Sequence, residues 1–169
     1  MDFSYFSTLA DYNRWANRRL YQACAEVGED EIARGRPSFF GSIPGTLNHI
    51  LVADRIWVAR IEGRRDDEIT SLDQILHDDF VVLRLAREGF DDHIARLVNG
   101  LSGDPTRPFS YHNVKGESCT LPLNHVLGHI FNHQTHHRGQ VHDMLAQTMV
   151  PPPPLDLAYF LLERQSVNA

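Results

Sequence analysis

Cysteine is scarce in this sequence: Cys24 and Cys119 are the only two in 169 residues. Two cysteines are too few for the disulfide framework that holds small secreted proteins together, so we expect two separate thiols. Long apolar runs are also missing, and no segment approaches the length of a membrane span. The N-terminal stretch MDFSYFSTLADYNRW has an early acidic residue and no cationic region, which is not the pattern of a secretory signal. These absences predict a cytoplasmic protein with no membrane partner.

Positive charge is in deficit. The chain has 16 lysines and arginines against 22 aspartates and glutamates, a net charge of -6, and the basic residues form no cluster. Nucleic-acid-binding surfaces carry a basic patch, so we expect no nucleic-acid partner. The remaining composition, 42% hydrophobic and 22% charged, is ordinary for a globular protein, and 169 residues suit a single domain over 1–169.

Apolar residues recur at helical spacing through most of the chain, with capping and turn signals between the runs. We expect four long helices over about 2–27, 43–62, 78–99 and from 120 or 121 to 148. The segment PFSYHNVKGESCTLP at 108–122 has alternating aromatic residues and a Lys-Gly turn, which predicts a small hairpin before the last long helix. After the stiff PPPP, the segment LDLAYFLLER is short and amphipathic and should dock on the bundle as a C-terminal helix. The pattern predicts an all-α four-helix bundle with short connections and one longer, hairpin-bearing connection before the last long helix.

The second expected helix is apolar on two sides, although a bundle core needs only one. One stripe consists of Leu47, Ile50, Leu51, Val58 and Ile61, and the other consists of His49, Val52, Ala53, Ile56 and Ala59. If the His49 stripe faces the core, the first stripe is left exposed, so we predict a homodimer that covers it. Alternatively, the hairpin or the C-terminal segment packs over the first stripe within one chain. Asp54 lies amid the first stripe, where a lone carboxylate is costly, and we expect Arg138 to pair with it.

Three amide side chains also fall on faces that should be buried: Asn13 and Asn17 on the first helix and Gln134 on the last. Buried amides need hydrogen-bond partners. The two asparagines therefore either satisfy each other and the backbone or line a polar pocket. Gln134 either orients a ligand or substrate or only bridges helices, and we prefer the bridging interpretation.

The stretch HIFNHQTHHRGQVH on the last long helix holds five histidines in fourteen residues. On a helical wheel of about 100° per residue, His137 lies about 40° and His133 about 80° from the centre of the buried face. His129, His136 and His125 lie about 120° to 160° away and should face solvent. The cluster therefore separates, and only His133 and His137 point into the bundle.

His133 and His137 are spaced i, i+4, so their rings can converge on one point. Histidine is not a preferred core residue, and two protonated rings side by side would repel, whereas a divalent metal removes both objections. A His-x-x-x-His pair has the spacing of metal ligands, and a third ligand must come from another helix. His49 is the candidate, although taken alone it is better explained as a hydrogen-bonded core residue. The alternative for the pair is hydrogen bonding inside the core.

Three imidazoles suit Zn or Ni, the metals that we expect, and also Fe, Co, Cu or Mn. They leave at least one coordination position open, which is the arrangement of a catalytic site. A metal held in this way can lower the pKa of a bound water or deliver a bound thiolate. Gln134 stands where the His-Glu-x-x-His motif of metalloproteases has its general base, so that class is excluded. No other general base is identifiable in the sequence, and neither cysteine has an electropositive setting.

Three segments, YNRWANRRLY, LNHILVADRIWVARIEG and HIFNHQTHHRGQVHDML, resemble the signature segments of the DinB-like (DinB/YfiT) superfamily, and LDLAYFLLE resembles its C-terminal segment. The resemblance covers most of the chain in the right order. It implies a four-helix bundle with a metal held by three histidines, which correspond to His49, His133 and His137. The superfamily name records damage-inducible expression and has no connection with the DNA polymerase that shares it.

Within the superfamily, the resemblance implies metal-dependent transfer or isomerisation with low-molecular-weight thiols, and dimers are common. We therefore expect a metal-dependent transferase of the thiol S-transferase kind, or a related hydrolase, that acts on a small-molecule substrate. Asn13, Asn17 and Gln134 are the candidate pocket residues. The alternative is a non-catalytic metal-binding or stress-response protein. A polar pocket beside the metal would favour the enzyme.

Overall fold

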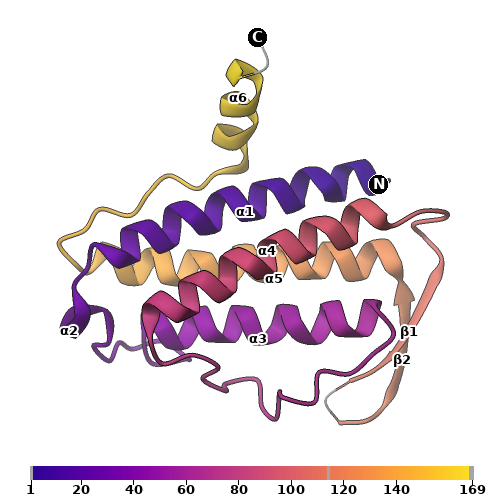
Figure 1. The fold of residues 1–169 in the computed structure, drawn as a ribbon, viewed down its shortest axis with the longest axis horizontal. Helices are drawn as coiled ribbons and strands as arrows, with labels where there is room; N and C mark the ends of the chain where they lie inside the picture. Colours follow the sequence, from indigo (N-terminus) through magenta and orange to yellow (C-terminus); the bar gives the residue numbers. More distant parts are fainter. Residues whose placement is uncertain (1, 114, 168–169) are drawn as a thin grey trace.

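The structure is a computed structural model, and it describes residues 2–113 and 115–167. These residues form four long helices, two short helices and one β-hairpin (Figure 1). The long helices are α1 (Phe3–Ala25), α3 (Ile43–Ile61), α4 (Phe80–Gly100) and α5 (Leu123–Ala146). The other elements are α2 (Glu29–Ile32), β1 (Pro108–His112), β2 (Ser118–Pro122) and α6 (Leu157–Val167). The predicted all-α bundle, with a hairpin before its last long helix and a short C-terminal helix, is confirmed.

The four long helices form a ring in which α1 and α3 each pack against both α4 and α5. The segment 62–79, called the crossover below, returns along α3 before α4 begins, so α3 and α4 run in the same direction (Figure 1). α5 lies beside α3 and runs antiparallel to it. The expectation of short connections is wrong for the crossover. The sequence of the crossover has no hydrophobic periodicity. It therefore does not indicate whether the segment turns back at once or runs the length of the bundle.

Side-chain caps mark the start of α1, α3 and α4. Asp2 accepts a hydrogen bond at 3.3 Å, and Ser42 one at 3.1 Å, each from the backbone amide three residues later. The predicted start of the last long helix at 120 or 121 is wrong. Pro122 instead ends β2, where it pairs with the first residue of β1, and α5 begins at Leu123. The hairpin therefore leads directly into α5.

The interior of the bundle has a polar layer between two apolar clusters. One cluster contains Leu20, Leu47, Leu83 and Val141, and the other contains Phe6, Val58, Ile94 and Val126, with further members from the same four helices. The polar layer, which lies between the clusters along every long helix, consists of Asn13, Asn17, Asp54, Arg87, Asp91, Gln134 and Arg138. Burial of the apolar clusters drives folding, whereas the polar layer is tolerated only if its members satisfy one another.

α3 is buried on both of its apolar sides within a single chain. Leu47 and Leu51 belong to one apolar cluster and Val58 to the other, and each is at most 2% exposed. α5 and the crossover cover the opposite side, where Nδ1 of His49 lies 2.7 Å from the carbonyl oxygen of Leu72. The expectation that the first stripe is left over for a partner is therefore wrong. A homodimer stays a prediction, but α3 does not provide its surface.

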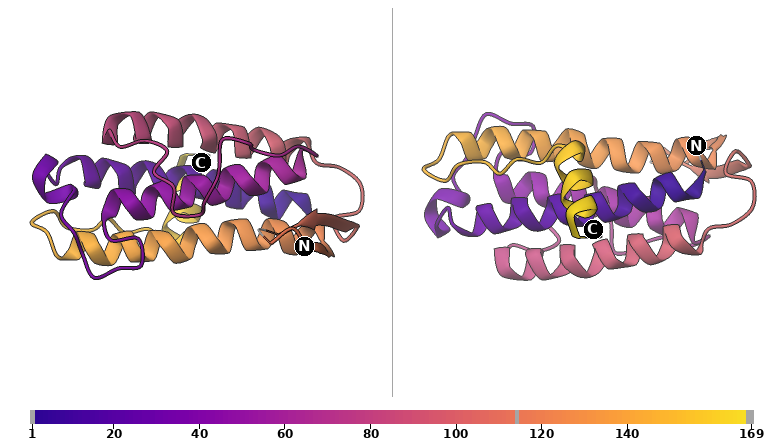
Figure 2. Two further views of the ribbon diagram at one scale, coloured as in Figure 1. Left: turned by 90° about the horizontal axis from the view of Figure 1, so that it is seen from below. Right: turned by 90° about the horizontal axis from the view of Figure 1, so that it is seen from above.

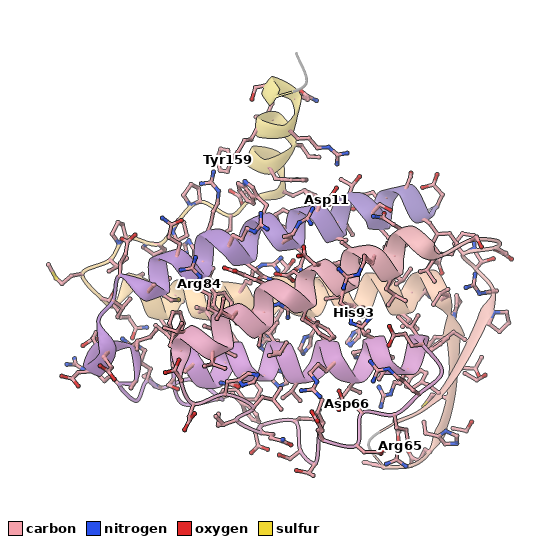
Figure 3. The ribbon with its side chains drawn as sticks, in the orientation of Figure 1. Asp11, Arg65, Asp66, Arg84, His93 and Tyr159 are labelled. Atoms are coloured by element: carbon pink, nitrogen blue, oxygen red, sulfur yellow. The ribbon has the colours of Figure 1, made fainter. Side chains whose placement is uncertain are left out.

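The C-terminal helix α6 docks on the bundle through one face. Phe160 is buried against Tyr12 and Trp15 of α1, and Tyr12 donates a hydrogen bond to the carbonyl of Leu155 at 2.8 Å. The rest of α6 crosses α1 and projects away from the bundle, as Figure 1 and Figure 2 show. Tyr159, labelled in Figure 3, is 53% exposed. Neither α6 nor any other helix among the described residues is long and apolar enough to cross a membrane.

Candidate metal centre

Three histidines meet between α3 and α5. His49 comes from the N-terminal half of α3, and His133 and His137 come from successive turns of α5. Their ring centroids lie 4.3, 4.5 and 5.0 Å apart. One ring nitrogen from each side chain lies within 4.8 Å of the other two. The structure thus brings together the three residues that the sequence grouped, in an arrangement that can hold a metal ion.

The spacing of two ring nitrogens resembles that of two ligands on one metal ion. Nε2 of His49 lies 3.2 Å from Nε2 of His133. Two nitrogens bound at about 2.0–2.1 Å to a tetrahedral Zn²⁺ lie about 3.3 Å apart. A hydrogen bond between two neutral rings has a similar length. The distance between these two nitrogens therefore fits both a metal site and a hydrogen bond, and the partners of the Nδ1 atoms give independent evidence.

Two of the rings have Nδ1 engaged outside the group. Nδ1 of His49 lies 2.7 Å from the carbonyl oxygen of Leu72, and Nδ1 of His137 lies 2.8 Å from Oε1 of Gln140. Both oxygens only accept, so each Nδ1 carries the proton and each Nε2 has a bare lone pair. Partners of this kind orient metal-binding histidines in proteins. Nδ1 of His133 is buried without a hydrogen-bond partner.

Asn48, next to His49 in the sequence, positions the crossover that supplies the Leu72 carbonyl. It is fully buried. Its Oδ1 accepts from the amides of Leu76 and His77 at 2.9 and 3.0 Å, and its Nδ2 donates to the carbonyl of His77 at 3.0 Å. Neither Asn48 nor Leu72 was predicted from the sequence. A buried asparagine beside a candidate ligand could have suggested the first, but a backbone acceptor leaves no sequence signal.

Phe40 closes one side of the group. Its ring stacks on that of His49, with centroids 3.9 Å apart and planes inclined by 18°, and it meets the His137 ring edge-on at 5.6 Å. The loop before α3 can approach this closely because Gly45 has no side chain; a Cβ there would collide with the carbonyl oxygen of Phe40. The stacked ring shields one face of His49 from solvent. The sequence analysis did not identify Phe40.

All three imidazoles are held in the neutral form. Burial disfavours the charged ring and lowers the pKa of His49 and of His137. Burial and the neighbouring rings together lower the pKa of His133 to about 3. A metal binds only the neutral imidazole, so these side chains are ready to coordinate at neutral pH without first losing a proton.

The other histidines of α5 lie outside the group. His125, His129 and His136 are exposed, as the helical wheel predicted. His142 is half-buried, and its Nε2 lies 3.1 Å from the carbonyl oxygen of Pro153. The crowding of histidines in the sequence therefore does not correspond to one large cluster in the structure.

Asn13, Asn17 and Gln134 lie in the polar layer of the bundle and not on an open surface beside the histidines. Each is at most 3% exposed. Both asparagines donate to a carboxylate oxygen of Asp91 at 3.0 Å, and Asn17 also donates to Oε1 of Gln134 at 3.3 Å. Gln134 donates in turn to Asp54. These contacts agree with the interpretation of Gln134 as a bridge between helices.

Asp54 pairs with Arg87 and not with Arg138. Arg87 Nη1 donates to Asp54 Oδ2 at 2.6 Å, and its Nη2 lies 2.9 Å from Asp91 Oδ1. Arg138 instead donates to Gln134 at 3.1 Å. The predicted pair of Asp54 with Arg138 is wrong because Arg87 reaches the carboxylate from α4. Spacing along α3 and α5 could not reveal a partner on a third helix.

The sequence is similar to known proteins along nearly its whole length. The family model described as the DinB family matches residues 1–165. The chain is also similar to a protein of Bacillus subtilis (strain 168) named Protein DinB. The two are 24% identical over 174 residues, which cover 99% of each chain.

Proposed function

The chain belongs to the DinB family, whose model spans nearly all of it, and we propose that it binds one divalent metal ion through His49, His133 and His137. The observation that carries the proposal is the convergence of three neutral imidazoles, two of which have Nδ1 engaged and Nε2 bare. Zn or Ni is the proposed metal, with Fe, Co, Cu and Mn as alternatives. A metal held by three such ligands keeps a position open, where it lowers the pKa of a water or binds a thiolate.

The proposed activity is transfer from a low-molecular-weight thiol to a small-molecule substrate, or a related hydrolysis. The chain contributes the positioning. Leu72 and Gln140 fix the proton on the outer nitrogens of two ligands, and Phe40 shields one face of His49 so that a substrate must approach from elsewhere. A metalloprotease mechanism is not proposed. Gln134 occupies the place of its general base and is turned into the polar layer.

A non-catalytic metal-binding or stress-response protein is the second candidate. It is favoured by one observation: the polar side chains expected to line a pocket, Asn13, Asn17 and Gln134, are committed to the bundle interior. Cobalt-substituted protein separates the two candidates. The enzyme should show a new charge-transfer band when a small thiol is added, because a thiolate enters the open position. A visible spectrum that no thiol or anion changes would favour the second candidate.

The ligand assignment is tested by the metal content of untagged protein. His133→Ala and His137→Ala should each abolish stoichiometric metal binding, because two imidazoles from one helix give at most a weak site. His125→Ala, which removes an exposed histidine of the same helix, is the matched control and should bind one metal ion per chain. Full metal occupancy in the His137→Ala protein would show that the assignment is wrong.

We also propose a homodimer, with α6 in place of α3 as its surface. Tyr159, Leu161 and Leu162 on α6 are 53%, 38% and 62% exposed. Tyr159 and Leu162 are spaced i, i+3 and share one side of the projecting helix, and exposed apolar residues of this kind are typical of an interface. Light scattering on dilute protein tests the proposal. A mass near one chain, 19.3 kDa, at micromolar concentration would rule the dimer out.

A further inference from the structure

A cleft of about 820 Å³ opens between the C-terminal half of α3, the crossover and the β-hairpin. Its volume falls within the range of small-molecule sites, about 300–1,000 Å³. The lining includes Ile56 and Arg60 of α3, Arg65, Asp66 and Leu72 of the crossover, and Tyr111 of the hairpin. Figure 3 labels Arg65 and Asp66, which lie in the crossover beneath α3. The cleft therefore lies on the side of α3 that the crossover covers.

Arg60 is a cation of this cleft without an acidic partner. Its guanidinium lies 4.6 Å from the ring centroid of Trp57 and 5.0 Å from that of Tyr111. Within the part of the chain that the structure describes, this guanidinium makes no ion pair and no hydrogen bond. The carboxylate of Asp66 is already held by Arg55 through two bonds of 2.8 and 2.9 Å. Burial lowers the pKa of Arg60, as expected for a charge removed from water without an acid beside it.

A line of rings connects the cleft with the three histidines. Trp57 contacts the ring of His129 at 5.0 Å, and His129 lies 5.8 Å from the ring of His133. Leu72, which lines the cleft, also holds Nδ1 of His49 through its carbonyl. Along α3, the eight residues from His49 to Trp57 span about 12 Å. The cleft and the histidine group are therefore neighbours, linked by these ring contacts and by Leu72.

We propose that this cleft binds the carboxylate end of an extended small-molecule substrate and that Arg60 pairs with the carboxylate. The inference rests on the proposed function, because it places the reactive end of the same molecule at the three histidines. A guanidinium that stacks on two rings keeps its N–H donors in the plane for a bidentate carboxylate. The eleven residues from His49 to Arg60 span about 16 Å along α3, which corresponds to about five extended amino-acid residues and sets the size of the ligand.

The test uses Trp57 as a reporter, because its ring lies behind the cleft in contact with Arg60 and Tyr111 of the lining. The chain has two tryptophans, so Trp15→Phe leaves Trp57 alone. This parent protein is titrated with N-acetyl-triglycine and with its C-terminal amide, which differ only in the carboxylate and carry no thiol or free amine. Fluorescence and calorimetry follow both titrations. We expect the carboxylate to bind at least about tenfold more tightly than the amide and to weaken as salt is added.

Variants then assign the effect to one side chain. Arg60→Gln should weaken carboxylate binding at least about tenfold, and Arg60→Lys should weaken it less, because the charge remains but the planar fork is lost. Arg96→Gln removes the same charge from an exposed position on α4 outside the cleft and should bind like the parent. If Arg60→Gln does not fold, the comparison of carboxylate and amide in the parent still decides. Equal binding of the two peptides, no saturable binding of the carboxylate, or parent-like binding by a folded Arg60→Gln overturns the proposal.

The titrations are run on metal-loaded and on chelator-treated protein. Arg60 touches none of the three histidines, so its preference for the carboxylate should persist without metal. Failure of the proposed function would appear as protein that binds no stoichiometric metal but still prefers the carboxylate. Failure of the present proposal would appear as protein that binds metal normally and does not distinguish the two peptides.

Discussion

Two polar clusters share α5, the polar layer and the histidine group. They differ in whether their polar atoms already have partners. His133 and His137 face α3, whereas their sequence neighbours Gln134 and Arg138 are buried in the polar layer. In the polar layer, the buried arginines and aspartates are paired with one another or with amides. In the histidine group, Nε2 of His49 faces Nε2 of His133, and one ring nitrogen from each of the three side chains converges on the same place. Two successive turns of a single helix thus serve both clusters.

The difference separates a cluster that holds the fold from one that can hold a ligand. An unpaired buried charge is very costly, so the polar layer persists only because its members neutralise one another. A neutral imidazole costs less to bury, and the outer nitrogens of His49 and His137 are satisfied by fixed oxygens. Acceptors that are oriented but unused are available to a cation. Acceptors that are already paired are not.

The largest expected effect comes from breaking the polar layer. Arg87→Met leaves the carboxylates of Asp54 and Asp91 buried without their cation, and should lower the free energy of unfolding by about 3–5 kcal/mol. Urea unfolding followed by circular dichroism measures the loss. The folded fraction should still bind one metal ion per chain, because Arg87 touches none of the three histidines.

Arg84→Met on the same helix is the matched control. It removes an exposed ion pair with Glu88 and should change the free energy of unfolding by less than about 1 kcal/mol. Equal losses in the Arg84 and Arg87 variants would show that the polar layer does not depend on its buried cation. The conclusion that the polar layer stabilises the fold through its buried ion pairs would then be wrong.

The same two clusters show how far the sequence predicts this protein. His133 and His137 could be paired because both belong to one helix, where spacing fixes direction. Arg87 was missed because its partners lie on other helices, and helical spacing says nothing about which helices are neighbours. The Leu72 carbonyl was missed because every residue has a carbonyl, and only the path of the crossover decides which one reaches His49.

The two clusters should also respond to pH in opposite directions. Burial raises the pKa of Asp54 from 3.8 to about 7, so between these values the folded protein keeps a proton that the unfolded chain has lost. This contribution to stability is present at low pH and is lost as the pH rises through about 7. The pKa of His133 is lowered from 6.5 to about 3, so the metal-free protein loses stability as the pH falls through that range.

Asp54→Asn isolates the first of these two effects. The variant has no carboxyl to titrate, so its free energy of unfolding relative to the parent should rise by on the order of 2 kcal/mol between about pH 5 and about pH 7.5. The changed contact with Arg87 affects the stability of the variant at both pH values, so the test uses only the change in the difference between them. Chemical unfolding of metal-free protein measures it. A difference that stays constant with pH would mean that Asp54 is ionised throughout.

A smaller effect is expected when the support of one metal ligand is removed. Gln140→Leu takes away the oxygen that accepts from Nδ1 of His137, and should weaken metal binding about tenfold. Competition with a chelator measures the affinity. Gln147→Leu is the control, because Gln147 is exposed and its amide donates to Asp143. Parent-like affinity in the Gln140 variant would show that His137 needs no partner to be oriented.

The smallest expected effect tests where the histidine group ends. The ring of His136 lies 4.7 Å from that of His137, and its Nε2 lies 3.3 Å from Nε2 of Gln140. It is nevertheless exposed, and it points about 100° around α5 from His137, away from His49. His136→Ala should therefore keep one metal ion per chain and change the free energies of metal binding and of unfolding by less than about 0.5 kcal/mol each. Metal analysis and chelator competition on untagged protein measure the first. A loss as large as that of Gln140→Leu would make His136 a member of the binding cluster, because exposure alone would then no longer separate the histidines that bind from those that do not.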